Sequence, residues 1–516
     1  MYKVLITTSG VGSRLGNLTK YTNKSLIRIG KKPVLSYIIE AYPKDIEFVI
    51  TLGYYGDHIR EFLTLAYPEY KFTFVEIDNF QGSGSSLVYS MFKAKNFLQC
   101  PFIFHACDTI VLESIPEPQY NWLGGYPSSS STNYRSLSVK DDIVIKINEK
   151  GELNYDYDYI GLAGIFDYED FWKSLEEVYN DHELDTQLSD CHVINNIDSK
   201  TFKCHVFHKW YDIGNSLSLK DARDNIGEKI NVLDKDDESI FIFEDSVIKF
   251  FHDRKTVKNR VDRVEYLKDS VPEILGYTDH FYKYSYAKGS LLADVANIKI
   301  FKEFLEWAQN RLWKKVNDPE FYSRALSFYK TKTHNRLIKF LDSNKIIDGM
   351  SLINGLEVPG ALKMLEDLNW DWLCNSKPCT FHGDFILDNI IKTEDGYKLL
   401  DWRQDFGDSL ISGDMYYDLG KLNHNLTINH DMIHKNLFEI SISSKEISCS
   451  IHLKYILYEC REVLHDFINR NGYDLKKVKV MTALIWLNMS PLHHYPFNIF
   501  LYYFGRYNLF KELFYA

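Results

Sequence analysis

In the first 225 residues, short apolar runs alternate with segments in which apolar residues recur at helical spacing. The helical segments are Pro33–Ala41 and His58–Ala66, and the apolar runs are KVLITT, FVITLGY, FTFVEI and FIFHACD. A short, continuously apolar run is typical of a strand that is buried on both faces. Because such strands alternate with helices, the pattern predicts a parallel sheet covered by helices on both faces.

The pattern changes near residue 227, where the segment GEKINVLDKDDES is polar and charged. The following run, SIFIFEDSVIKFF, predicts a two-stranded ribbon that turns at Glu244–Asp245, and Val257–Leu267 predicts a charged helix. From Ile298 onward helical patterns dominate, with one short β interruption at TFHGDFILDNIIKTEDGYKLLDW, and Leu484–Phe510 predicts a buried helical region. We therefore expect two domains, residues 1–228 and 229–516, the second with a small lobe at about 229–290 and a helical lobe at about 291–516.

Length and composition agree with a globular protein of more than one domain, because 516 residues exceed what one hydrophobic core usually holds. A formal net charge of -11 argues against a general nucleic-acid binder, although a local group of cations still suffices for nucleotides. The start MYKVLITTSG has no signal-peptide pattern, and no window reaches the ~20 apolar residues of a membrane span. The eight cysteines form no CxxC pair. We expect a cytoplasmic protein with free thiols.

A glycine-rich segment, SGVGSRL, follows the first predicted strand directly. Glycines at such a turn let backbone N–H groups approach a phosphate chain, and the start of a helix adds positive potential. Because many turns contain glycine, the segment alone does not indicate a phosphate site. Charged residues that could act together with it would be needed for that interpretation. The candidate nucleotide-binding residues of this segment are Ser9, Gly10, Gly12 and Ser13.

Three charged residues strengthen the interpretation as a nucleotide site. Arg14 follows the glycines, and Lys24 comes ten residues later in TNKSLIRIG. Asp108 ends the apolar run HACDTIV, and the carboxyl end of a parallel strand faces the crevice where such sheets bind ligands. A carboxylate there suits Mg²⁺, which prefers oxygen ligands.

With these features in place, residues 1–225 resemble the sugar-phosphate nucleotidyltransferase family, which has a Rossmann-like α/β fold. The family signature contains Gly-x-Gly-x-Arg, Pro-Lys, a metal-binding Asp, a Glu-Lys pair and a second Asp. The sequence departs from it at Asn23, which replaces the usual proline, and at Ser9, where Gly or Ala is common. The matching positions are Gly10, Gly12, Arg14, Lys24, Asp108, Glu149, Lys150 and Asp212.

The resemblance implies a role for each matched residue. Arg14 and Lys24 would bind the triphosphate and steer the departure of pyrophosphate. Asp108 and Asp212 would share the metal ion. Glu149 and Lys150 would belong to the substrate-binding site, where Lys150 would contact the acceptor phosphate. Gln81 and Gly82 would lie near the base. For Glu149 alone, a solvated surface charge is an equally good interpretation.

The segment HGDFILDN, followed by LLDW, carries the second candidate site. Phosphoryl transfer to a hydroxyl needs a carboxylate beside the acceptor proton and oxygen ligands for Mg²⁺ on the nucleotide. Asp384, Asn389 and Asp401 have these chemical types, in an order that resembles the aminoglycoside phosphotransferase and choline kinase family, whose fold is protein-kinase-like. The resemblance implies that Asp384 is the catalytic base and that Asn389 and Asp401 hold Mg²⁺. His382 is interpreted as a structural support of the loop, and Asp418 matches a structural position of the family.

The small lobe of this domain is less diagnostic. Lys249 lies on a predicted strand at the position of the family's ATP-phosphate lysine, and Glu265 follows on the next helix at a distance suited to its ion pair. No glycine-rich phosphate loop precedes Lys249. The sequence therefore leaves open a degenerate kinase fold.

These motifs together predict a bifunctional enzyme with an α/β, Rossmann-like first domain and a kinase-like α+β second domain. The kinase would phosphorylate a small alcohol or sugar with ATP, and the transferase would couple the product to a second NTP, CTP or another, with Mg²⁺ at both sites. A sugar and an amino alcohol such as choline both remain open as substrates, and synthesis of surface polysaccharide is the setting that the resemblance suggests. The alternatives are a nucleotidyltransferase regulated by a non-catalytic, nucleotide-binding kinase fold, and an assembly scaffold. The expected partners are small molecules and nucleotides, with a homo-oligomer left open.

Overall fold

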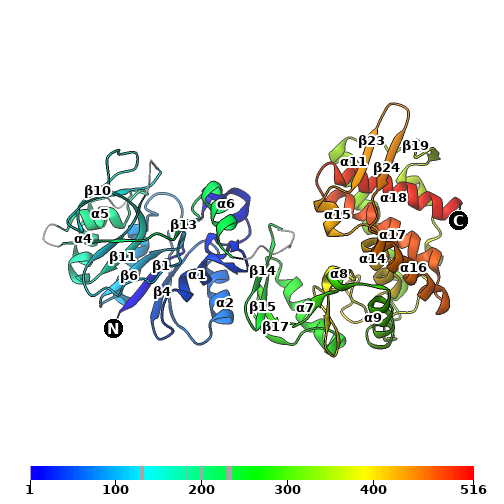
Figure 1. Cartoon of the computed structure of the whole chain (residues 1–516), viewed down its shortest axis with the longest axis horizontal. Coiled ribbons are helices and arrows are strands. Elements are labelled where there is room, and N and C mark those ends of the chain that lie inside the picture. Colours follow the sequence, from blue (N-terminus) through cyan, green and yellow to red (C-terminus); the bar gives the residue numbers. More distant parts are fainter. Residues whose placement is uncertain (1, 128–132, 183, 198–200, 228–234, 516) are drawn as a thin grey trace. The chain divides into compact units, whose positions relative to one another are not determined.

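The computed structural model describes residues 2–127, 133–182, 184–197, 201–227 and 235–515. The chain divides into two compact units, Met1–Val257 with Leu275–Tyr286, and Lys258–Ile274 with Ala287–Ala516. Figure 1 shows the helices and strands of both, coloured along the sequence. The predicted domain boundary between residues 228 and 229 lies outside the described residues.

Four strands of the first unit form the parallel part of its sheet. They are β1 (Lys3–Thr7), β4 (Glu47–Leu52), β5 (Lys71–Glu76) and β6 (Phe102–Ala106), in the order β5-β4-β1-β6. All three pairings are parallel, which confirms the prediction from the apolar runs.

Helices cover both faces of this sheet. Successive side chains of a strand point to opposite faces, so an apolar strand makes both faces apolar and both must be buried. Val4 and Ile6 of β1 pack in one core cluster, whereas Leu5 packs in another. The first face is covered by α1 (Val34–Glu40), α2 (Gly56–Ala66) and α6 (Ser216–Asn225), and the second by α3 (Leu87–Ala94), α4 (Tyr168–Asp181) and α5 (Asp190–Asn195) (Figure 1). The predicted helices at Pro33–Ala41 and His58–Ala66 are therefore confirmed.

The rest of the sheet is mixed, so the prediction of a parallel sheet holds for these four strands and not for the strands added beyond β6. The nine strands run in the order β5-β4-β1-β6-β11-β8-β12-β10-β9, and β11 (Tyr157–Ile165) is antiparallel to β6. For β9 (Ser136–Lys140) and β10 (Ile143–Asn148), the antiparallel pairing follows from the short turn that joins them. Only Asp141 and Asp142 join these strands, both with positive φ, and a two-residue turn of this kind brings strands together antiparallel. The other two strands are β8 (Trp122–Tyr126) and β12 (Lys203–Val206).

The predicted ribbon is present as β14 (Glu238–Ile242) and β15 (Ser246–Phe251), which pair antiparallel. It extends into a four-stranded sheet, β14-β15-β17-β16, with β17 (Phe281–Ser285) and β16 (Ile274–Tyr277). The ring of Phe62 on α2 lies 5.4 Å from that of Phe241 and 6.0 Å from that of Phe281. The ribbon therefore completes the apolar core of the first unit.

The second unit is mainly helical. Its longer helices are α9 (Ile298–Arg311), α11 (Lys332–Asn344), α14 (Met415–Asn425), α16 (Tyr455–Arg470), α17 (Leu475–Met489) and α18 (Phe497–Phe514). Helices α17 and α18 contain the predicted buried region and are buried on most sides, which confirms that prediction. No helix in the described part of the chain combines the length and apolar character needed to cross a lipid bilayer.

Two small sheets accompany these helices, and the sequence predicted one of them. The predicted hairpin is β21 (Ile390–Thr393) with β22 (Gly396–Leu399), joined by β18 (Ser290–Leu291). The second sheet, β20-β19-β24-β23, corrects the expectation of one β interruption. Its strands have only three to five residues, too few for a periodic signal, although the turn Asn354-Gly355 is a hairpin signal. They are β19 (Ser351–Ile353), β20 (Leu356–Val358), β23 (Phe438–Ile442) and β24 (Ile447–Ile451).

We predict that Phe281→Ala lowers the free energy of unfolding of the first unit by about 3–5 kcal/mol, because it empties a fully buried position between the ribbon and α2. Urea unfolding of the full chain, followed by circular dichroism, measures the change. The matched control is Phe97→Ala, whose ring is 44% exposed and whose loss should cost less than about 0.5 kcal/mol. Equal losses in the two variants would contradict the packing of the ribbon against α2.

Candidate functional site

The glycine turn follows β1 at the carboxyl edge of the parallel strands. Gly12 and Gly16 have left-handed backbones, with φ of 70° and 57°. A Cβ atom at Gly12 would lie 3.1 Å from the Cβ of Lys24, so the turn passes close to the lysine loop. Glycine is needed at position 12 for its backbone conformation and for this close approach.

Lys24 and Asp108 form the central ion pair of the first unit. Lys24 Nζ lies 2.8 Å from Asp108 Oδ2, with only 17% and 21% of the two side chains exposed. Burial alone would raise the pKa of Asp108, but the charges of Lys24 and Arg14 outweigh it and lower that pKa. The same pair raises the pKa of Lys24 against the effect of burial. Both groups are therefore charged near neutral pH.

Asp212 joins this pair from β13 (Trp210–Asp212), which is antiparallel to β7 (Thr109–Val111). A Cβ atom at Gly214 would lie 3.0 Å from Asp212 Oδ1, 3.4 Å from Arg14 Nη2 and 3.5 Å from Asp108 Oδ2. Burial and the charge of Asp108 raise the pKa of Asp212. The structure thus brings together residues that the sequence separates by about two hundred positions.

The two carboxylates suit Mg²⁺, because it prefers oxygen ligands and commonly keeps only one or two protein carboxylates. Burial and, after it, the nearby charge of Asp108 disfavour the ionised form of Asp212 and raise its pKa, and a divalent cation bound there would favour that form. Among the described residues, no group of three or more His, Cys, Asp or Glu side chains is arranged to hold a metal. Any ion at Asp108 and Asp212 would therefore take its other ligands from phosphate oxygens and water.

A cavity of about 290 Å³ opens beside this group. The loop before α3 supplies a large part of its lining, whereas Gln81 and Gly82, on the same loop, are exposed and lie outside the lining. Arg14, Gly12 and Ser13 also lie outside it. The lining residues near the ion pair and on the loop are Ser9, Gly10, Lys24, Asp108, Asn79, Phe80, Ser85 and Ser86.

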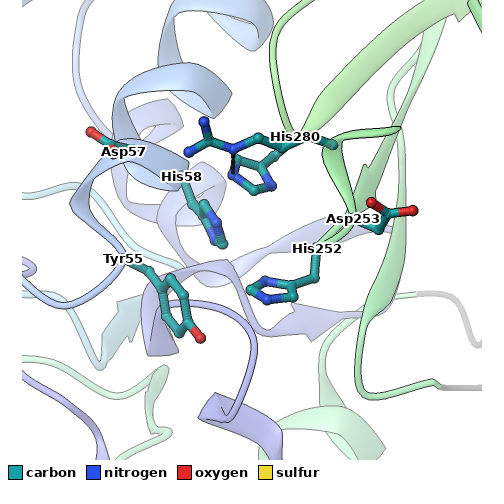
Figure 2. Close-up of a pocket in the computed structure, with 7 residues that line it drawn as sticks. Tyr55, Asp57, His58, His252, Asp253 and His280 are labelled. Atoms are coloured by element: carbon teal, nitrogen blue, oxygen red, sulfur yellow. Dashed lines mark hydrogen bonds between the residues drawn. The ribbon is translucent and has the colours of Figure 1, made fainter. Parts of the chain in front are cut away.

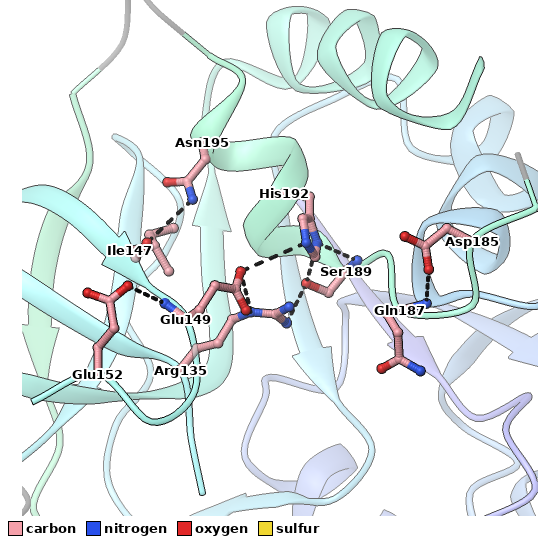
Figure 3. A network of polar contacts seen from close by, with 9 residues as sticks. All are labelled: Arg135, Ile147, Glu149, Glu152, Asp185, Gln187, Ser189, His192 and Asn195. Atoms are coloured by element: carbon pink, nitrogen blue, oxygen red, sulfur yellow. Dashed lines mark hydrogen bonds and ion pairs between the residues drawn. The ribbon is translucent and has the colours of Figure 1, made fainter. Parts of the chain in front are cut away.

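Glu149 and Lys150 lie on the exposed turn after β10. Arg135 Nε donates to Glu149 Oε2 at 3.1 Å, and Arg135 Nη1 donates to Ser189 Oγ at 2.7 Å. Figure 3 shows that these contacts, together with His192, form one network. The described contacts of Glu149 are thus with this network rather than with the Lys24–Asp108 pair, so its role and that of Lys150 stay predictions.

Asn23, which stands in place of the family's proline, holds the lysine loop against the sheet. Its Nδ2 donates to the carbonyl oxygens of Thr8 and Tyr54 at 2.8 and 2.7 Å, and its Oδ1 accepts from Ser25 N at 2.9 Å. The side chain is fully buried. The departure from the family pattern was visible in the sequence. The two carbonyl partners of Asn23 were not, because they lie just after β1 and β4, far from Asn23 along the chain.

In the second unit, the predicted catalytic loop brings Asp384 and Asn389 together. Asn389 Nδ2 donates to the carbonyl oxygen and to Oδ2 of Asp384, at 2.9 and 3.1 Å. His382 Nε2 donates to Leu400 O at 2.8 Å, while its Nδ1 accepts from Asp384 N at 3.2 Å. Burial lowers the pKa of His382 to about 4, so the ring is neutral near pH 7. These contacts suit a residue that supports the loop.

Asp418 fixes the same loop from α14. Its carboxylate accepts from His382 N at 2.8 Å, from Gly383 N at 2.7 Å and from Trp313 Nε1 at 3.0 Å. The group is fully buried, and each oxygen is satisfied by a donor of the protein. This geometry agrees with the structural role that the resemblance implied.

Two arginines of α7 (Arg254–Leu267) contact the predicted catalytic segment and were missed in the sequence. Arg260 forms an ion pair with Asp401. Arg263 is fully buried and donates to the backbone carbonyls of Phe381, Leu410 and Arg403. Basic residues on a charged helix give no signal of their own, because they usually face solvent.

The predicted small-lobe residues lie in different units. Lys249 is buried in the middle of β15, opposite Ile240 and Tyr282, and belongs to the first unit. Glu265 is exposed on the part of α7 that belongs to the second unit. Their joint role in binding ATP stays a prediction.

A third feature that the sequence did not reveal is a cavity of about 550 Å³ in the first unit, lined in part by three histidines (Figure 2). The ring of His58 lies 4.3 Å from that of His280, which accepts a hydrogen bond from Arg254 Nε at 3.1 Å. Burial, followed by the charges of His280, His252 and Arg254, lowers the pKa of His58 to about 3. This ring is therefore neutral near pH 7.

Comparison with solved structures returns several nucleotidyltransferases. A Bacillus anthracis protein assigned as a glucose-1-phosphate thymidylyltransferase is 18% identical over 46% of this chain and 98% of its own, with a TM-score of 0.38. The CTP:phosphocholine cytidylyltransferase of Streptococcus pneumoniae is 18% identical over 43% and 98%, with a TM-score of 0.36. The inositol-1-phosphate CTP transferase of T. maritima is 17% identical over 43% and 95%, with a TM-score of 0.34. No protein-family model and no curated protein matches the sequence.

We predict that Asn23→Ala lowers the free energy of unfolding by about 1–3 kcal/mol, because the carbonyl groups of Thr8 and Tyr54 lose their donor. Thermal unfolding of the full chain measures this change. The control is Asn225→Ala, because that side chain is exposed and its Nδ2 donates only within its own helix. A loss no greater than in the control would mean that Asn23 does not fix the lysine loop.

Proposed function

We propose that the first unit is a nucleotidyltransferase, which joins a nucleoside monophosphate from an NTP to the phosphate of a small alcohol or sugar. An oxygen of the acceptor phosphate attacks the α-phosphorus of the NTP, the α–β bridging bond breaks, and pyrophosphate leaves. The observation that carries this proposal is the convergence of Lys24, Arg14, Asp108 and Asp212 at the carboxyl edge of a parallel sheet.

Each group has a chemical reason to be there. Lys24 and Arg14 are fixed cations that stabilise negative charge on the phosphates as pyrophosphate leaves. The glycine turn offers backbone N–H groups without side chains in the way. Asp108 and Asp212 would hold Mg²⁺, which supplies positive charge to the reacting phosphates.

For the second unit we infer a small-molecule kinase that supplies the acceptor of the first. The alcohol oxygen attacks the γ-phosphorus of ATP, the bond to the bridging oxygen of ADP breaks, and the hydroxyl proton passes to Asp384. The contact between Asn389 and Asp384 supports this assignment, because it sets a metal-binding amide beside the base. Asn389 and Asp401 would hold Mg²⁺ on the nucleotide.

One observation favours a second candidate, a non-catalytic nucleotide-binding regulator. Asp401 and Asp384 are both ion-paired, with Arg260 and Lys421, and an inactive fold would keep such pairs permanently. The deciding experiment incubates the full chain with ATP, a second NTP and a panel of alcohols and sugars, each in free and phosphorylated form. Pyrophosphate release with phosphorylated compounds alone, together with ADP formation from free ones, supports two enzymes acting in sequence. Pyrophosphate release without ADP formation from any free compound would support the regulator.

We predict that Asp212→Asn lowers the kcat of pyrophosphate release by about 10²-fold or more, because a carboxylate ligand of a charge-stabilising ion is lost. ATP-dependent phosphorylation should stay within twofold, since the change lies in the other unit. The control is Asp181→Asn at the exposed end of α4. Pyrophosphate release at the parent rate would reject the metal assignment of Asp212.

We predict that Asp384→Asn lowers ADP formation by about 10²-fold or more, through loss of the general base. Nucleotide binding, measured by calorimetry with Mg·ATP, should persist because Asn389 and Asp401 remain. The matched control, Asp342→Asn, changes an exposed aspartate of α11. Loss of nucleotide binding together with ADP formation would show that Asp384 is structural.

A further inference from the structure

The two carboxylate oxygens of Asp384 face different chemical groups. Oδ2 accepts from Asn389 Nδ2 at 3.1 Å, on the side of the proposed metal ligands. Oδ1 lies 2.7 Å from Lys421 Nζ, which projects from α14. Because a base takes its proton from the acceptor, the side away from Asn389 is where the acceptor hydroxyl belongs, and Lys421 marks that side.

Three more basic residues lie near Lys421, close enough for their charges to act on one another. Lys332 Nζ lies 3.9 Å from the centre of the Phe328 ring, and Arg403 Cζ lies 4.8 Å from the same centre. Arg336 follows Lys332 by four residues on α11, and therefore shares its helix face. We call Lys332, Arg336, Arg403 and Lys421 the cation cluster.

Within the described part of the chain, the hydrogen bonds of these two guanidinium groups go to neutral acceptors rather than to carboxylates. Arg403 Nε donates to Asp405 O at 2.9 Å, and Arg336 Nη1 donates to Asn488 O at 3.2 Å, both of them neutral carbonyl groups. Asp384 balances Lys421, and Asp405 is the acid whose charge acts on Lys332. The cation cluster thus has four basic groups and two nearby acids.

The electrostatic cost of this arrangement is seen in the pKa of Lys332. Burial, followed by the charges of Arg403, Arg336 and Lys421, lowers the pKa of Lys332 to about 6. Burial, with Arg403 also contributing, likewise lowers the pKa of Arg336. Like charges held together in a half-buried site destabilise one another, and an anion placed among them would remove that cost.

We propose that the acceptor of the second unit carries an anionic group, a carboxylate or a phosphate, which Lys332, Arg336 and Arg403 bind while its hydroxyl meets Asp384. This inference rests on the proposed kinase function and narrows the class of acceptor that the kinase would use. A quaternary ammonium such as that of choline would be repelled by the positive groups of Arg336, Arg403 and Lys421, so amino alcohols are disfavoured. The hydroxyl of a sugar acid, a hydroxy acid or a sugar phosphate fits the charges instead.

The test compares small alcohols that differ in charge. The full chain is given Mg·ATP with choline, glycerol, D-glycerate or glycerol phosphate, and ADP formation is followed. We expect kcat/KM for an anionic acceptor to exceed that for choline and glycerol by about 10-fold or more, as charge-assisted hydrogen bonds provide. A separate calorimetric titration with D-glycerate and inorganic phosphate measures anion binding without turnover.

Two substitutions and one control locate the effect. Lys332→Met and Arg403→Gln keep much of the side-chain volume, and each should raise the KM for the anionic acceptor by about 10-fold while the KM for ATP changes less than twofold. Lys339→Met makes the same change on the exposed side of α11 and should leave both values unchanged. A KM for ATP within twofold of the parent value shows that the second unit of each variant, which holds the substitution, is folded.

The pH dependence gives a further readout. Because free Lys332 has a pKa of about 6 and an anion would raise it, binding takes up a proton above pH 6. The KM for the anionic acceptor should therefore rise as the pH increases above 6, and this rise should be absent in Lys332→Met. The groups that face Lys332 are Arg336, Arg403, Lys421 and Asp405.

The possible outcomes separate this inference from the kinase proposal. Preferred phosphorylation of choline or glycerol would overturn the inference and leave the kinase intact. Anion binding that is equal in the parent and in a Lys332→Met/Arg403→Gln double variant would also overturn it, whatever the turnover. Anion binding that is lost in the double variant, without ADP formation from any acceptor, would retain the anion site and reject the kinase function.

Discussion

The candidate sites of both units are built on partly buried carboxylates that lie beside cations. Lys24 neutralises Asp108, Lys421 neutralises Asp384, and Arg260 neutralises Asp401. An isolated charge inside a protein loses most of its hydration, so each of these acids needs a partner to remain ionised. The partner keeps the pKa of Asp108 and of Asp384 low in spite of burial.

The same pairing explains how such sites can hold highly charged substrates. The phosphate oxygens of a nucleotide compete with the aspartate for the lysine or arginine of the pair. The Mg²⁺ that accompanies the nucleotide offers the aspartate a positive charge in exchange. Binding can therefore exchange one set of pairs for another without leaving a charge uncompensated. Lys332, Arg336 and Arg403 differ in this respect, because few acids face them. Their excess of positive charge is what points to an anionic acceptor.

Much of the first unit was predictable because its signals are local. The parallel strands β1, β4 and β6 are largely apolar runs, and each of the two predicted helices has apolar residues at helical spacing. The antiparallel strands were missed, since β9 and β10 mix polar with apolar residues and are recognisable mainly by the turn at Asp141 and Asp142. In the second unit, β19 and β20 were missed because three-residue strands have no readable period.

By itself the sequence determined the parallel core, the ribbon, the buried C-terminal helices and the chemical types at Lys24, Asp108, Asp384 and Asn389, because strand runs and short motifs are encoded within a few residues. The tertiary structure decided which distant groups meet. It placed Asp212 beside Asp108, drew Arg260 and Arg263 of α7 to the catalytic segment, and gathered the cation cluster from three separate segments. Such contacts depend on how elements pack, and packing joins residues whose separation in sequence carries no signal.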